Sequence, residues 1–177
     1  HQGQNASIAL AGATAFLGLE IPASIVENSF QDITLPGRFE VISTEPLVIL
    51  DGAHNPPGAL AAAQTLKSSF TFEGTKALIV GMTEEKDADW MLSNLNASEF
   101  DCIFTTEASS PRSMSSEELA KVASKYCSKT IVCPNPEDAL KEAIQISSSD
   151  GVIFGTGSMY VVGALREANE KFQSEQK

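Results

Sequence analysis

The chain has 177 residues, is 42% hydrophobic and carries a formal net charge of −11. This length and apolar content suit one α/β domain with additional residues, because a domain of this size buries enough surface to form its own core. The negative charge argues against a nucleic-acid partner, since phosphate backbones bind Lys and Arg, and it argues equally against acidic lipid surfaces.

The N-terminal residues have helical periodicity. Alanines and larger apolar residues recur at helical spacing over 5–19, which predicts a helix, and a short helical turn over 22–28 follows it. Turn-forming residues cluster at 35–38, and the periodicity is lost there. We therefore predict a helical unit over 1–34 and a separate domain over 35–177.

Beyond that boundary, short apolar runs alternate with helical patterns. Strands are predicted over 39–43, 47–50, 77–80, 102–105, 130–132 and 151–154. Helices are predicted over 56–70, 86–95, 115–127, 136–146 and 158–172, the third opened by a capping box of Ser115 and Glu118. Strands that alternate with helices indicate βαβ units, so we expect a Rossmann-like α/β domain of three layers with a mostly parallel sheet.

The segments that follow the strands are the candidates for a site, because ligands of open parallel sheets bind outside the carboxyl ends of the strands. Four such segments are rich in Gly, Ser, Thr or charge: 51–57, 81–87, 105–112 and 155–158. Their composition predicts a binding site along this edge of the sheet.

The most informative of these segments is Leu-Asp-Gly-Ala-His-Asn-Pro at 50–56. It places the Asp51 carboxylate at a strand tip, and Asn55 can cap the helix that Pro56 begins. We expect this helix N-terminus to direct free N–H groups into the crevice as an anion site. Asp51 can accept from a ribose or an amide, and His54 can donate to a phosphate. The same residues can instead tie the turn together with His54 exposed, and the residue types alone do not separate these interpretations.

This segment resembles the signature of the folylpolyglutamate synthase and dihydrofolate synthase family, a branch of the Mur ligase superfamily. Further segments follow in the family's order: His-Gln-Gly-Gln-Asn-Ala at 1–6, Leu-Pro-Gly-Arg-Phe-Glu at 35–40, Gly-Met and Glu-Lys-Asp within 81–87, Ser-Pro-Arg at 110–112 and Thr-Gly-Ser-Met-Tyr at 156–160. Glu85 stands where many relatives carry Asp, which replaces one carboxylate with another. The resemblance implies that 35–177 is the C-terminal glutamate-ligase domain and that 1–34 is the helical end of the central ATPase domain.

The resemblance also implies which residues contact ATP. Asn5 would face the base, Arg38 the phosphates, and Asp51 the ribose or the polar edge of the site. A guanidinium suits phosphates because it is permanently charged and offers forked donors, although a surface arginine at a linker is the alternative for Arg38. Asp51 and His54 are the residues that we expect to take part in catalysis.

For the incoming amino acid, which this domain holds in the family, the candidates are His54, Arg112 and Ser158. Arg112 suits a carboxylate because a guanidinium can make paired hydrogen bonds with it. Local roles stay open for two of these residues. Arg112 precedes a predicted helix and Ser158 stands at the start of another, so each can be a cap.

The reaction that the resemblance implies is ATP-dependent addition of L-glutamate to folate or dihydropteroate. ATP phosphorylates a carboxylate, and the amine of glutamate attacks the acyl phosphate. Mg²⁺ is expected as a cofactor, with the phosphate-binding loop and the metal ligands in the N-terminal and central domains of the family. This chain has no G-x-x-x-x-G-K-[ST] run and no predicted metal ligand, so we expect it to be inactive alone.

Three other functions compete with this one. A nicotinamide-binding domain requires a third glycine where Tyr160 stands. A cell-wall Mur ligase domain more often carries Asp-Tyr-Ala-His-Asn-Pro, so Gly52 favours the folate branch. A non-catalytic module that holds a nucleotide or another anion is the third alternative.

The remaining features indicate the cellular compartment of the protein. The cysteines at 102, 127 and 133 have no CxxC spacing and are odd in number, which predicts free thiols. No signal peptide is apparent, and no apolar run approaches the roughly 20 residues of a membrane span. We expect a cytoplasmic, monomeric parent enzyme without membrane partners, and a chain that begins with His1 in helical sequence is expected to be a fragment of it.

Overall fold

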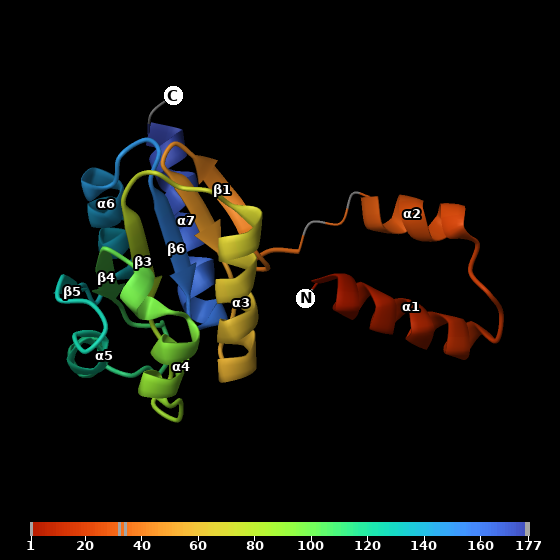
Figure 1. Cartoon of the computed structure of the whole chain (residues 1–177), viewed down its shortest axis with the longest axis horizontal. Coiled ribbons are helices and arrows are strands. Elements are labelled where there is room, and N and C mark those ends of the chain that lie inside the picture. The colour runs from red at the N-terminus through yellow and green to blue at the C-terminus, as the bar shows by residue number, and fades with distance from the viewer. Residues whose placement is uncertain (1, 32, 34, 176–177) are drawn as a thin grey trace. The chain divides into compact units, whose positions relative to one another are not determined.

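The computed structural model describes residues 2–31, 33 and 35–175. It divides into two compact units, His1–Leu35 and Pro36–Lys177, and each is described by itself. Figure 1 shows the helices of the first unit, and the sheet and helices of the second.

The described part of the first unit contains two helices, α1 (Gln2–Leu17) and α2 (Ala23–Gln31). The α1 helix begins at Gln2 rather than at the predicted residue 5. It ends where Gly18 adopts a φ of +66° and donates its N–H to Thr14 O at 3.0 Å, a conformation that glycine adopts without a Cβ clash. The segment predicted as a short turn is a helix of 9 residues. Its assignment to an ATPase domain stays a prediction.

The second unit contains a six-stranded sheet in the order β1-β2-β6-β3-β4-β5. Its strands are β1 (Glu40–Thr44), β2 (Leu47–Leu50), β3 (Lys76–Val80), β4 (Cys102–Thr105), β5 (Thr130–Val132) and β6 (Val152–Thr156). The β1 strand runs antiparallel to β2, and every other neighbouring pair is parallel. This confirms the predicted α/β fold. Because β6 inserts between β2 and β3, the loops that follow these three strands are neighbours at one edge.

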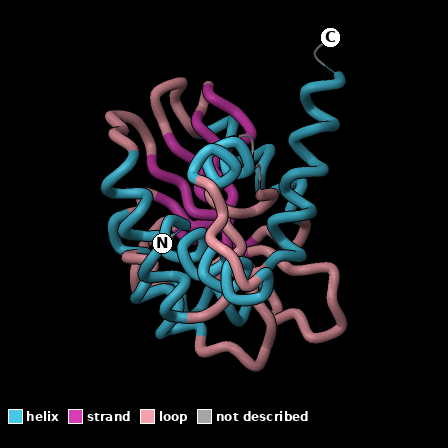
Figure 2. The backbone as a smooth tube through the Cα atoms, turned by 90° about the vertical axis from the view of Figure 1, so that its right-hand side faces the viewer, coloured by secondary structure: helices cyan, strands magenta, loops and turns pink. Residues whose placement is uncertain are grey.

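Helices cover both sides of this sheet (Figure 2). They are α3 (Pro56–Ser69), α4 (Ala88–Asn94), α5 (Ser116–Ala123), α6 (Pro136–Ile146) and α7 (Met159–Glu175), with a short 3₁₀ turn at Ala97–Glu99. None of the helices in the described ranges combines the length and apolar character that crossing a bilayer requires.

Side chains that cap the helices explain where the helices begin. Asn55 accepts from Gly58 N–H at 2.9 Å, as the sequence predicts. The α4 helix begins two residues later than predicted, because Asp87 lies outside it and accepts from Trp90 N–H at 2.9 Å. The α5 helix ends at Ala123 rather than at the predicted residue 127, since a tighter turn with i to i+3 hydrogen bonds follows it.

The sequences of the strands are continuous apolar runs because both faces of the sheet are buried. Side chains alternate between faces along a strand. Along β3, Leu78 and Val80 join the core beneath α3, α4 and α5, whereas Ala77 and Ile79 join the core beneath α6 and α7. The three-layer architecture therefore follows from two apolar clusters on opposite sides of one sheet.

The cysteines belong to this buried structure. Cys102, Cys127 and Cys133 are buried and free, which confirms the prediction of unpaired thiols. Burial raises the pKa of Cys102 to about 11, so its thiol stays protonated at neutral pH and is a poor nucleophile.

Gly81 directly follows β3, and the loop after β4 leaves no space for a side chain at this position. A Cβ at this position would overlap Thr106 O and lie 2.9 Å from Val161 Cγ2. We expect Gly81→Ala to lower the free energy of unfolding by about 1–3 kcal/mol, because backbone must shift to admit the methyl group.

Gly163→Ala is the matched control for this substitution. Nothing lies within 4 Å of a Cβ added at Gly163 on α7, and alanine favours a helix over glycine by about 1 kcal/mol. We therefore expect Gly163→Ala to be neutral or stabilising. Urea unfolding of both variants measures the two changes, and equal losses would contradict the packing constraint at Gly81.

Candidate functional site

Backbone hydrogen bonds join the loop after β2 to the end of β6 and to the loop that follows β6. Asp51 N–H donates to Gly155 O at 3.0 Å, and Gly157 N–H donates to Ala53 O at 3.1 Å. Gly157 has a φ of +102°, and a Cβ there would lie 2.5 Å from Gly81 O in the loop after β3. The three neighbouring loops are therefore packed backbone to backbone, which requires glycine at their centre.

Asp51 is buried at this edge, with 3% of the residue exposed. Its Oδ2 accepts from Phe39 N–H at 3.0 Å, and its Oδ1 accepts from Ala53 N–H at 3.0 Å. Both carboxylate oxygens are thus engaged by the backbone. The structure shows the turn-tying role that the sequence left open, and contact between Asp51 and ATP stays a prediction.

The pKa of Asp51 reflects both its burial and its neighbours. Burial raises the pKa of the Asp51 carboxyl above its ordinary value, because desolvation disfavours the charged form. The hydrogen bonds from Phe39 and Ala53 oppose this effect, as do the charges of Arg38 and His54. Arg38 and His54 therefore lie near enough to Asp51 to influence its carboxyl, and the roles of all three in binding or catalysis stay predictions.

Arg38 is exposed and lies between two residues in the left-handed region, Gly37 with a φ of +66° and Phe39 with a φ of +52°. Gly37 O accepts from Gly52 N–H at 2.7 Å, so the turn at Gly37–Phe39 contacts the loop after β2 directly. Within the described ranges, no hydrogen bond or ion pair engages the Arg38 guanidinium. Its charge is available to an anionic ligand.

His54 is exposed and its ring orientation is defined by one contact. Its Nδ1 lies 2.9 Å from Gly52 O. A carbonyl oxygen only accepts, so a hydrogen bond here requires the proton on Nδ1. The Nε2 atom is then free to accept a proton or, in the charged ring, to donate one.

The predicted anion site at the N-terminus of α3 is wrong. Pro56 and Pro57 have no N–H, and Asn55 holds the next two, since its side chain accepts from Gly58 N–H and its carbonyl accepts from Ala59 N–H. The capping that the sequence predicted thus uses the donors that an anion would need. An anion at this edge would have to contact side chains instead.

Ser158 and Arg112 occupy different places. Ser158 is buried and its Oγ accepts from Tyr160 N–H at 3.2 Å, so it caps α7. Arg112 is exposed, and its Nη1 lies 3.9 Å from Glu85 Oε1. Its carbonyl accepts from Glu84 N–H at 2.9 Å, which attaches this loop to the loop after β3. Glutamate binding by either residue stays a prediction.

Asn5 lies on α1, in the first unit, and is exposed. Its role in ATP binding also stays a prediction. No group of three or more His, Cys, Asp or Glu side chains that could hold a metal ion occurs among the described residues.

Sequence reasoning missed Glu40 and Met159. Glu40 Oε2 accepts from Gly37 N–H at 2.8 Å, and a Cβ on Gly52 would overlap Met159 Sδ. The only sequence signal for Glu40 is an acidic residue next to a turn that carries Arg38. Met159 lies in the segment at 156–160 that carries the resemblance, but nothing local in the sequence indicates its contacts, which lie far away in the chain.

Comparison with known proteins identifies relatives of this chain. Residues 37–159 match the family described as Mur ligase, glutamate ligase domain. The dihydrofolate synthase/folylpolyglutamate synthase of Mycobacterium tuberculosis is 35% identical over 153 residues, which are 84% of this chain and 31% of that protein. The chain thus spans about a third of the length of this relative.

Solved structures agree with this match. Folylpolyglutamate synthase of Mycobacterium tuberculosis complexed with ADP has a TM-score of 0.88 and 33% identity, covering 96% of this chain and 40% of that one. A bifunctional folylpolyglutamate synthase/dihydrofolate synthase with Mn, AMPPNP and L-glutamate bound has a TM-score of 0.71 and 26% identity, covering 88% of this chain and 36% of that one.

The raised pKa of Asp51 predicts a pH dependence of stability. An ordinary aspartate has a pKa of 3.8. As the pH rises above this value, the Asp51 carboxyl loses its proton in the unfolded chain but keeps it in the folded state. The free energy of unfolding contributed by Asp51 therefore falls until the pH passes the folded-state pKa. Asn does not ionise. We therefore expect the free energy of unfolding of Asp51→Asn, relative to wild type, to rise as the pH increases from 3.8.

Urea unfolding of both proteins from about pH 3.5 to 6.5 measures this difference. The other carboxyl groups titrate in both proteins and cancel in the comparison. A difference that stays constant over this range would contradict the raised pKa of Asp51.

Proposed function

Because the chain belongs to the folylpolyglutamate synthase and dihydrofolate synthase family, within the Mur ligase glutamate-ligase domains, we propose that it forms the C-terminal part of an enzyme that joins L-glutamate to folate or dihydropteroate with ATP. This membership confirms the resemblance predicted from the segment at 50–56. The domains that precede the C-terminal part in the relatives supply the remainder of the active site.

The observation that carries this proposal is the exposed Arg38 guanidinium, unpaired within the described part of the chain and next to Phe39, whose N–H donates to Asp51. Forked donors match phosphate oxygens, and such a cation is most effective when domain closure excludes water. The ADP in the solved Mycobacterium tuberculosis relative supports a nucleotide as the ligand.

We propose that ATP phosphorylates the terminal carboxylate of the folate, after which the amine of L-glutamate attacks the acyl carbon and phosphate leaves. Arg38 neutralises charge on the transferred phosphoryl group. His54 presents Nε2 as an acceptor for the proton that the amine loses. The Ser158 hydroxyl and Arg112 are the candidate contacts of the glutamate carboxylates. A relative with L-glutamate and AMPPNP bound supports these substrates.

Mg²⁺, when bound, neutralises charge on the phosphates of ATP. The described residues do not fit a ligand set for it, since both oxygens of Asp51 accept backbone N–H groups and the described part of the chain has no acidic or histidine cluster. We therefore assign the metal ligands to the preceding domains.

Gly52, whose identity in the sequence favours the folate branch over the cell-wall branch, is closely packed. A Cβ there would overlap Met159 Sδ and lie 3.3 Å from Gly37 O. A tyrosine at this position, as in Asp-Tyr-Ala-His-Asn-Pro, requires space that the turn and Met159 occupy.

Arg38→Ala in the complete ligase tests the role of the guanidinium. Loss of a charged donor aimed at phosphoryl oxygens is expected to lower kcat/KM for ATP by about 100-fold. Lys141→Ala, which removes an exposed cation from α6, is the control and is expected to leave the rate unchanged. In a folate-ligase-deficient cell, growth supported by Arg38→Ala would favour a non-catalytic binding module instead.

The 177-residue chain alone is expected to add no glutamate, because it lacks a phosphate-binding loop sequence. Incubation with ATP, Mg²⁺, labelled glutamate and either dihydropteroate or tetrahydrofolate tests this, with the complete ligase as the positive control. If the chain alone formed labelled product, the expectation that the other domains are needed for glutamate addition would be refuted.

A further inference from the structure

Glu40, at the start of β1, has a largely buried side chain that is 11% exposed. Both of its carboxylate oxygens have partners. Oε2 accepts from Gly37 N–H at 2.8 Å, and Oε1 lies 3.3 Å from Arg166 Nε on α7. The carboxylate therefore links the turn at Gly37–Phe39 to the last helix of the domain.

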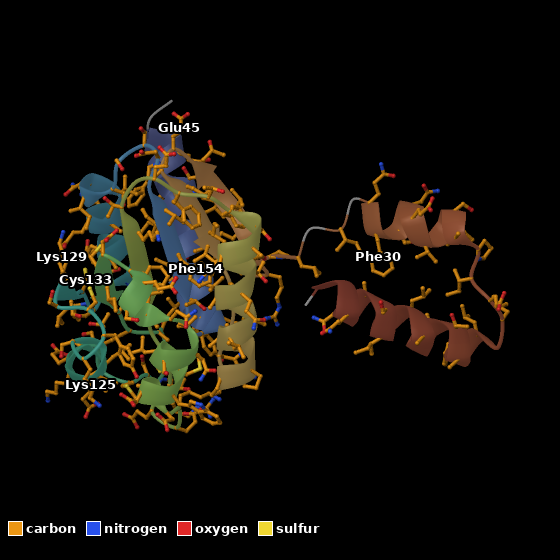
Figure 3. All side chains as sticks on the ribbon, in the orientation of Figure 1. Phe30, Glu45, Lys125, Lys129, Cys133 and Phe154 are labelled. Carbon is orange, nitrogen blue, oxygen red and sulfur yellow. The ribbon has the colours of Figure 1, made fainter. Side chains whose placement is uncertain are left out.

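This turn depends on such contacts because its backbone is strained. Phe39 is not glycine, yet it has a φ of +52°, a conformation that persists only where the surroundings hold it. Its N–H donates to Asp51 Oδ2. Its ring centroid lies 5.6 Å from that of Phe154, inside the domain (Figure 3), and 6.0 Å from that of Phe70.

Arg38 stands between these two anchored residues. Glu40 holds Gly37 on one side, and Asp51 holds Phe39 on the other. Glu40 is also the acidic residue nearest to Arg38 in the described sequence, yet it pairs with Arg166. Arg166 thus pairs with Glu40, and within the described part of the chain the Arg38 guanidinium makes no ion pair of its own.

We infer that Glu40 is a positioning residue, which together with Arg166 holds the turn from which Arg38 reaches the phosphates of ATP. This inference rests on the proposed function. It predicts that Glu40 affects catalysis only through Arg38, whereas a structural link between β1 and α7 would act on stability alone.

A double-mutant cycle in the complete ligase tests this inference. Misplacement of Arg38 in Glu40→Ala is expected to lower kcat/KM for ATP by about 10- to 100-fold. Glu40→Gln keeps an acceptor for Gly37 N–H, so we expect a loss of less than about threefold. In an Arg38→Ala background, Glu40→Ala is expected to have almost no further effect, because both substitutions remove the same interaction.

Glu137→Ala is the matched control, because Glu137 Oε2 also pairs with a cation on α7, Lys171 Nζ at 3.3 Å. It is expected to leave kcat/KM for ATP unchanged. Independent losses from Glu40→Ala and Arg38→Ala would overturn the positioning role. An inactive wild-type ligase would instead overturn the proposed function.

Thermal unfolding of each variant establishes that it is folded. If Glu40→Ala does not fold, Arg166→Met replaces it in the cycle. That substitution leaves the acceptor of Gly37 in place but frees the Glu40 charge to pair with Arg38. A loss of activity is then expected only while Arg38 is present, and an unchanged rate would overturn the inference.

Discussion

The buried carboxylate of Asp51 joins two segments of the domain at the edge where the site lies. One oxygen accepts from Phe39 N–H, on the segment that leads into β1, and the other accepts from Ala53 N–H, in the loop after β2. A buried charge is costly unless it is hydrogen-bonded, so the two segments separate only by leaving this carboxylate unpaired. Arg38 precedes Phe39 and His54 follows Ala53, so each lies next to one of these two donors in the chain.

Close backbone approach reinforces this arrangement. Gly37 and Gly52 pack against each other, with a 2.7 Å hydrogen bond between them, and Met159 at the start of α7 lies where side chains on either glycine would project. The insertion of β6 between β2 and β3 brings α7 to this position. Sheet topology thus explains why a helix at the end of the chain packs on a turn near residue 38.

In the proposed function, a side chain rather than a helix N-terminus contacts the phosphate. The first turn of α3 has two prolines, and its next two N–H groups are taken by Asn55. In a chain with a formal charge of −11, the exposed guanidinium of Arg38 is then a local exception to the net field. In the proposed function, Arg38 pairs with a phosphate only if neighbouring acidic side chains pair with other cations. Glu40 does so, because it pairs with Arg166.

The sheet-and-helix pattern, the cap at Asn55 and the loops that meet at one edge are predictable from the sequence, because they depend on periodicity, local hydrogen bonds and parallel strand direction. It also carried the family resemblance. The folded chain was needed to show that Asp51 accepts from Phe39 N–H and that Glu40 pairs with Arg166, a residue far away in the chain. These contacts depend on strand order and on two left-handed residues beside Arg38, and no local pattern specifies either.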